Sequence, residues 1–113
     1  MSISKLKRET VYGKYGGRCA YCGREIAYAE MQVDHFHPRR TSQDPSVDEL
    51  ENLMPACRMC NHYKRAHSLE TFRKYIEEIP RKLSENYIYK IGIVYGEVAE
   101  QNHPVKFYFE EVE

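Results

Sequence analysis

Long apolar runs are absent from this chain of 113 residues, since none approaches the roughly 20 residues that a membrane-spanning helix needs. The N-terminal residues 1–5 also lack the apolar core of a secretory signal peptide. The sequence contains no internal repeat and no low-complexity segment. These absences speak against membrane and repeat proteins, and they lead us to expect a globular cytoplasmic protein in a compartment where disulfide bonds are rare.

The chain also has no net charge, because 17 Lys and Arg residues balance 17 Asp and Glu residues. This neutrality does not by itself indicate a nucleic-acid partner. The charges are unevenly distributed, however: residues 1–82 have a balance of +4 and residues 83–113 have a balance of −4. A basic binding surface on the first segment and an ordinary scatter of surface charge both remain open.

Four cysteines stand in two Cys-x-x-Cys pairs, Cys19/Cys22 and Cys57/Cys60. We expect one domain over residues 1–113, and a chain of this length gains stability from a metal that links its segments. Two matched pairs of thiolates are typical of a tetrahedral structural zinc site. The alternative, a redox dithiol, needs only one reactive pair.

The segment between the two cysteine pairs is unusually long. It contains 34 residues, Gly23 to Ala56, where about 15–20 are usual for a zinc site of this kind. Within it lie Asp34 and His35, and an imidazole can accept a proton from water near neutral pH while a carboxylate can bind a hard divalent cation. The spacing therefore indicates a zinc-stapled scaffold that encloses a second, polar site.

The pattern of apolar residues predicts a mixed α+β fold. Ser4 is a plausible N-cap for the first helix, and the pair Gly16-Gly17 ends it. Expected helices cover residues 4–15, 59–66 and 69–79, with a short helical turn at 48–50. Residues 85–95 fit either a short helix, which we favour, or a strand at 87–91. Expected strands cover residues 25–28 and 32–36, paired as a hairpin, and 105–109 at the C-terminus. Residues 39–47 form a polar loop.

Four motifs follow one another along this part of the chain: Cys19-Ala20-Tyr21-Cys22-Gly23, Val33-Asp34-His35, Glu51-Asn52-Leu53 and Cys57-Arg58-Met59-Cys60-Asn61-His62-Tyr63-Lys64. In these motifs the sequence resembles the HNH nuclease family, of the zinc-stapled ββα-metal type found in small phage and bacterial proteins. The resemblance covers about residues 15–67, and residues 68–113 form a helical and strand extension. It implies a ββα-metal core with flanking helices, stapled by the four cysteines.

The resemblance also implies a role for each matched residue. His35 corresponds to the general base that activates water, and Asn52 to the asparagine that braces the loop and orients this base. Asp34 and Asn61 correspond to the ligands of a catalytic Mg²⁺, Mn²⁺ or similar cation, with His62 as an alternative to Asn61.

Further residues are candidates for contact with DNA. Lys64 lies one helical turn beyond Asn61 and can face the same phosphate. Arg39, Arg40 and His37 follow the expected base and are candidates for contact with the DNA backbone.

Three functional hypotheses remain at this stage. The first is a metal-dependent endonuclease that acts on DNA, in a bacterial or phage-infected cytoplasm. The second is a zinc-stabilised DNA-binding module that does not cleave. The third is a nuclease subunit that is active only in a larger complex, with a protein partner that supplies specificity.

Overall fold

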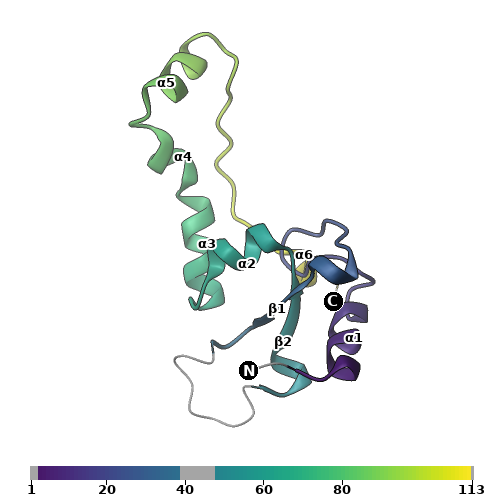
Figure 1. Ribbon diagram of the computed structural model, residues 1–113. Helices are drawn as coiled ribbons and strands as arrows, with labels where there is room; N and C mark the ends of the chain where they lie inside the picture. The colour runs from purple at the N-terminus through teal and green to yellow at the C-terminus, as the bar shows by residue number, and fades with distance from the viewer. Residues whose placement is uncertain (1–2, 39–47, 113) are drawn as a thin grey trace. The chain divides into compact units, whose positions relative to one another are not determined.

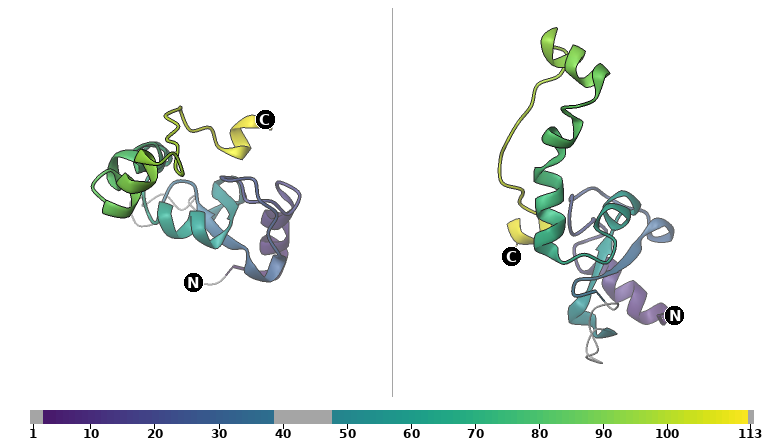
Figure 2. Two further views of the ribbon diagram at one scale, coloured as in Figure 1. Left: turned by 90° about the horizontal axis from the view of Figure 1, so that it is seen from above. Right: turned by 90° about the vertical axis from the view of Figure 1, so that its left-hand side faces the viewer.

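A computed structural model describes residues 3–38 and 48–112. The chain divides into two compact units, which we call the core unit (Met1–Leu69 with Lys106–Glu113) and the inserted unit (Glu70–Val105). The core unit contains α1 (Lys5–Gly13), the 3₁₀ helix η1 (Tyr28–Glu30), β1 (Gln32–His35), the 3₁₀ helix η4 (Leu50–Asn52), β2 (Leu53–Ala56), α2 (Arg58–Lys64) and α6 (Tyr108–Glu111) (Figure 1). Helices α3 (Leu69–Glu77), α4 (Ile79–Leu83) and α5 (Tyr87–Val94) follow one another, and an extended return segment comes after them (Figure 2). No helix among the described residues is long and apolar enough to cross a membrane.

Helix α1 begins as the sequence predicts. The Ser4 hydroxyl oxygen accepts a hydrogen bond from the Lys7 amide at 3.1 Å, which satisfies one of the amide groups that a helix leaves unpaired at its start. The helix ends at Gly13, and the chain then turns through Gly16 and Gly17, whose φ angles are +63° and +81°. Glycine adopts these left-handed conformations without the strain that a Cβ would cause.

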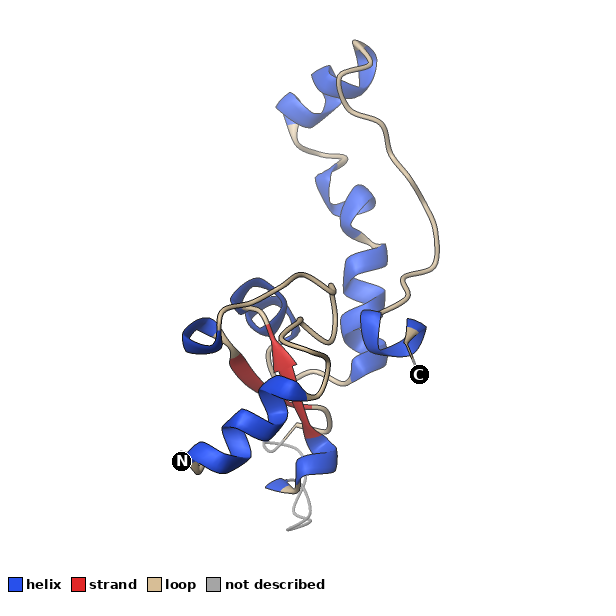
Figure 3. Cartoon of the chain, turned by 90° about the vertical axis from the view of Figure 1, so that its right-hand side faces the viewer, coloured by secondary structure: helices blue, strands red, loops and turns tan. Residues whose placement is uncertain are grey.

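The sheet consists of β1 and β2, which pair antiparallel with Asp34 opposite Met54 and His35 opposite Leu53 (Figure 3). The expected hairpin between residues 25–28 and 32–36 is therefore wrong. Glu25 forms only an isolated bridge with Arg18, and the chain enters η1 before β1. Strand β2 escapes prediction because all four of its residues are buried, so that it lacks the alternation of a half-buried strand, and because Pro55 cannot donate a ladder hydrogen bond.

The core of this unit joins α1 to both strands. Val11 from α1, Met31 and Leu53 are at most 2% exposed, and they form one cluster. Partly buried hydrophobic residues pack around the cluster: Tyr12, Ile26, Val33 and Leu50. The burial of these apolar side chains fixes the strand pair against α1.

The helices after β2 agree with the predictions to within a few residues. Helix α2 begins at Arg58, and α3 ends at Glu77, just before Pro80 enters the first turn of α4. Proline fits a first helical turn because no amide donor is needed there. Helix α5 is capped by Asn86, whose side-chain oxygen accepts from the Tyr89 amide at 3.0 Å.

The expected C-terminal strand at residues 105–109 is wrong, because the chain forms α6 instead. The Glu110 carboxylate accepts from the Phe107 amide at 2.9 Å, which is half of a capping box and favours a helical turn. The amides of Tyr108 and Phe109 donate to the carbonyl oxygens of Tyr21 and Ala20 at 3.0 and 2.8 Å. These bonds tie the C-terminal residues of the chain to the first cysteine pair, and the β propensity of the aromatic residues is overridden.

Candidate metal centre and catalytic site

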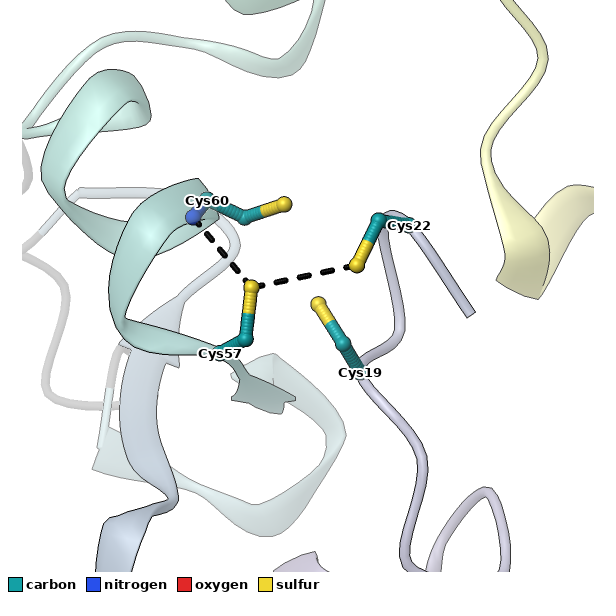
Figure 4. Close-up of side chains that lie close together, drawn as sticks. All are labelled: Cys19, Cys22, Cys57 and Cys60. Atoms are coloured by element: carbon teal, nitrogen blue, oxygen red, sulfur yellow. Dashed lines mark hydrogen bonds between the residues drawn. The ribbon is translucent and has the colours of Figure 1, made fainter. Parts of the chain in front are cut away.

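The four cysteines meet at one point of the core unit (Figure 4). Their Sγ atoms all lie within 4.8 Å of one another, and those of Cys22 and Cys57 are 3.8 Å apart. Cys22 is exposed, whereas the other three cysteines are buried. Four sulfur atoms in this arrangement can bind one tetrahedral metal ion, as the sequence predicts.

Local backbone hydrogen bonds fix the geometry of each cysteine pair. At the first pair, the Gly23 amide donates to the Cys19 carbonyl at 3.0 Å, in a turn that requires the φ of +80° at Gly23. At the second pair, Cys57 is the N-cap of α2, and its Sγ accepts from the Cys60 amide at 3.4 Å. Antiparallel pairing of the strands and a hydrogen bond of 2.8 Å from the Ala20 amide to the Pro55 carbonyl bring the two pairs together.

The sulfur cluster has an electropositive neighbour. The Arg24 guanidinium donates to Cys22 Sγ and Cys57 Sγ, both at 3.4 Å. Within the cluster, a hydrogen bond from Cys60 lowers the pKa of the Cys19 thiol to about 4, and the same bond raises the pKa of Cys60. A metal ion bound by the four sulfurs would displace the thiol protons.

Asp34 lies in a buried polar network beside the cluster. The Tyr21 hydroxyl donates to Asp34 Oδ2 at 2.6 Å, and the ammonium of Lys64 lies 3.1 Å from the same oxygen. Asp34 is 5% exposed and Lys64 is fully buried. Burial raises the pKa of Asp34, and this effect outweighs the opposing influence of the Lys64 charge. Tyr21 comes from between the first two cysteines, so the network connects the sulfur cluster directly to β1.

His35 is half-buried at the end of β1, and its Nε2 lies 2.9 Å from Asp48 Oδ1. Asn52 braces the chain beyond it: its Oδ1 accepts from the His37 amide at 2.7 Å, and its Nδ2 donates to the His37 carbonyl at 3.0 Å. The Asn52 carbonyl also accepts from the Phe36 amide at 2.8 Å. Asn52 is 8% exposed, and its three bonds hold the segment that follows His35 against η4.

Asn61 and His62 occupy the first turns of α2, and they line an open groove of about 1040 Å³ together with Arg58 and Gln32. Asn61 is half-buried and His62 is exposed. Neither Asp34 nor His35 lines this groove. The Asp34 carboxylate therefore contacts Tyr21 and Lys64. Asn61 and His62, the residues expected to bind a catalytic cation together with Asp34, line the groove instead.

The predicted substrate contacts differ in outcome. The expectation that Lys64 faces a phosphate does not fit the structure, because its ammonium is fully buried between Asp34 and the His35 carbonyl, to which it donates at 3.2 Å. Arg39 and Arg40 lie outside the described residues. His37, in contrast, is exposed at the end of the strand.

Two site residues carry no signal that we recognised in the sequence. Tyr21 stands between cysteines that dominate its motif, and only the fold directs its hydroxyl to Asp34. Asp48 lies far from His35 in the sequence, so its contact depends on the pairing of β1 with β2.

The site combines a four-sulfur metal clip with a two-stranded sheet, a following helix, and an aspartate-histidine pair on the first strand. A family profile described as HNH endonuclease matches residues 19–67, which include all of these elements. The resemblance to the HNH nuclease family seen in the sequence is confirmed by this match over residues 19–67.

Relatives of known identity agree with this assignment. The chain is 38% identical over 47 residues to "CRISPR-associated endonuclease Cas9" of Corynebacterium diphtheriae, a match that covers 42% of this chain and 4% of the relative. It is similar to the crystal structure of the Type II-C Cas9 enzyme from Actinomyces naeslundii, with a TM-score of 0.54 and 26% identity over 66% of this chain and 8% of that chain. The chain thus spans only a small part of the length of these proteins.

Proposed function

We propose that this protein is a metal-dependent HNH endonuclease that hydrolyses phosphodiester bonds of DNA, by nicking one strand or cutting both. The observation that carries the proposal is the bracing of the His35 segment: Asn52 bonds both backbone groups of His37, inside the stretch that matches the HNH family. Such bracing fixes the backbone that follows His35 at the end of a strand, and general-base catalysis requires a base that is held in place.

The roles of the chain's own residues follow from their positions. His35 accepts a proton from the attacking water, and its half-buried imidazole lies at the end of β1, whose backbone is held by pairing with β2. Lys64 holds the Asp34 carboxylate through an ion pair, and Tyr21 holds it through a hydrogen bond. Asp34 is in this way oriented by groups that are themselves buried.

Two metal ions complete the proposal. The four cysteine sulfurs fit a structural zinc ion in number, type and mutual distance. Asp34 and Asn61 provide oxygen donors of the kind that Mg²⁺ or Mn²⁺ prefers, with His62 as the alternative to Asn61, and such a cation supplies charge stabilisation at the scissile phosphate when bound. In this structure the Asp34 carboxylate is paired with Lys64, so a bound cation would have to replace this ion pair.

The substrate and partners are proposed on the same basis. His37 is exposed next to the base, and with Arg39 and Arg40 it is proposed to contact the DNA backbone. The protein is proposed to act in the cytoplasm of a bacterial or phage-infected cell.

Plasmid cleavage tests the proposal. Zinc-loaded protein is incubated with supercoiled plasmid and Mg²⁺ or Mn²⁺, and parallel reactions contain EDTA or the His35→Ala variant. We expect conversion to nicked or linear DNA that EDTA and the variant both abolish. Equal cleavage by a folded, zinc-loaded His35→Ala protein would contradict the assignment of His35.

A second candidate is a nuclease that is active only in a larger complex. The observation that favours it is the small share of each relative that this chain covers, 4% and 8%. In this case the isolated protein binds DNA without cutting it, and a protein partner supplies specificity. Binding of duplex DNA by zinc-loaded protein, with no cleavage under any divalent cation, would favour this candidate or a non-catalytic binding module.

A further inference from the structure

The imidazole of His35 has a carboxylate partner that the sequence motif does not contain. Asp48 Oδ1 lies 2.9 Å from His35 Nε2, which is the distance of a good hydrogen bond. The His35 side chain is 20% exposed and that of Asp48 is 35% exposed, so the contact is partly shielded from water. A partly shielded, charge-assisted bond of this length is strong enough to orient a ring.

Asp48 is held in place by α1 and not by His35 alone. The Lys7 ammonium donates to the Asp48 carbonyl oxygen at 3.0 Å. Lys14, the C-cap residue of α1, donates to the carbonyl oxygens of Leu50 and Leu53 at 2.9 and 2.7 Å. These two lysines therefore bind the backbone of residues 48–53. Their bonds fix the backbone position from which the Asp48 side chain extends.

The backbone of His35 is fixed independently. Its carbonyl oxygen accepts from Lys64, and its residue pairs with Leu53 in the sheet. The remaining freedom of His35 is rotation of its side chain, and the Asp48 carboxylate restricts that rotation. A carboxylate accepts hydrogen bonds, so the nitrogen that faces it carries the hydrogen. Nε2 is then the protonated nitrogen of the neutral ring, and Nδ1 carries the lone pair.

We propose that Asp48 is the positioning residue for His35: it fixes the ring in one orientation and in the Nε2–H tautomer, so that Nδ1 is the atom that accepts the proton from water. This inference rests on the proposed nuclease function. Asp48 acts through His35 and does not touch the substrate, so it governs the rate of the chemical step and not the binding of DNA.

Two readouts test the inference separately. The first is the tautomer of His35, read from long-range ¹H–¹⁵N correlations of ¹⁵N-histidine-labelled, zinc-loaded protein, at a pH above the titration range of a free imidazole. We expect the Nε2–H tautomer in the wild-type protein and its loss or mixture in Asp48→Asn. The exposed neighbour Glu49 provides the matched control, and Glu49→Gln retains the wild-type spectrum.

The second readout is the kinetics of DNA cleavage. We expect Asp48→Asn to lower kcat by about 10- to 100-fold, the range found when a supporting partner of a functional histidine is removed, with KM unchanged. Lys7→Met, which releases the backbone of Asp48, lowers kcat less, and Lys5→Met, at an exposed position in the same helix, leaves it unchanged.

The outcomes separate this inference from the proposed function. A wild-type His35 in the Nδ1–H tautomer, or a spectrum that Asp48→Asn does not alter, would overturn the positioning role whatever the activity. A fall in kcat that is matched by an equal rise in KM would also overturn it. The wild-type protein could instead be inactive but show the Nε2–H tautomer, with loss of that tautomer in Asp48→Asn. This result would support the positioning role of Asp48 and overturn the proposed nuclease function.

Discussion

The buried ion pair between Lys64 and Asp34 yields a quantitative prediction. In Lys64→Met, the Asp34 carboxylate, which is 5% exposed, keeps its hydrogen bond from the Tyr21 hydroxyl but loses its cationic partner. Removal of one partner of a buried pair typically destabilises a protein by about 3–5 kcal/mol, because the other charge stays buried and uncompensated. A loss of this size is a large part of the roughly 5–15 kcal/mol that stabilises a typical domain.

The double variant Asp34→Asn/Lys64→Met separates this charge effect from simple loss of packing. Replacing a buried ion pair by neutral residues of similar volume is often nearly neutral, because the cost of burying both charges offsets their attraction. We therefore expect the double variant to unfold within about 1 kcal/mol of wild type, although each single variant is strongly destabilised.

Urea unfolding of zinc-loaded protein is the assay, and the midpoint at constant slope gives the change in stability. Lys5→Met, at an exposed position in the same unit, serves as the control and is expected within about 0.5 kcal/mol of wild type. Losses in the double variant that equal the sum of the single losses would refute the reasoning, since the two charges would then not interact.

Three further predictions concern the scaffold. Cys57→Ser is expected to unfold the core unit in thermal melts, because metal binding at the four sulfurs is coupled to folding; an unchanged melt with zinc lost would contradict this. Tyr21→Phe lowers the free energy of unfolding by about 1–3 kcal/mol in urea with zinc content unchanged, since a buried carboxylate loses a hydrogen bond; a neutral effect would show that this bond is dispensable. Phe107→Ala, at a ring that is 2% exposed and 5.5 Å from that of Tyr21, costs about 3–5 kcal/mol by the same assay, whereas the exposed Val112→Ala does not shift the midpoint.

Local features of the fold could be predicted from the sequence. The two cysteine pairs, the Ser4 cap and the glycine at position 23 each act over a few residues, so their geometry follows from spacing and residue type. The apolar stripe at residues 69–79 similarly predicts α3. The residues that determine each of these features lie within the feature itself.

Features that depend on distant parts of the chain could not be predicted in the same way. The partner of β1 is β2, whose Pro55 and uniform burial give no strand signal. Nothing in the sequence shows that Lys14 donates to the carbonyl oxygens of Leu50 and Leu53. The sequence predicts that Lys64 faces a phosphate, but the tertiary fold buries it against Asp34. In each case a non-local contact decides the outcome.

The central claim is that the imidazole of His35 activates the water that attacks DNA. It is tested most directly by single-turnover cleavage of a labelled DNA duplex by zinc-loaded wild-type, His35→Ala and His103→Ala proteins, with Mg²⁺ or Mn²⁺. His103 is an exposed histidine of the inserted unit, and it controls for the loss of an imidazole as such. The account predicts that His103→Ala cleaves like wild type, that His35→Ala does not cleave, and that added imidazole restores part of its rate. Wild-type cleavage rates in folded His35→Ala protein would contradict it.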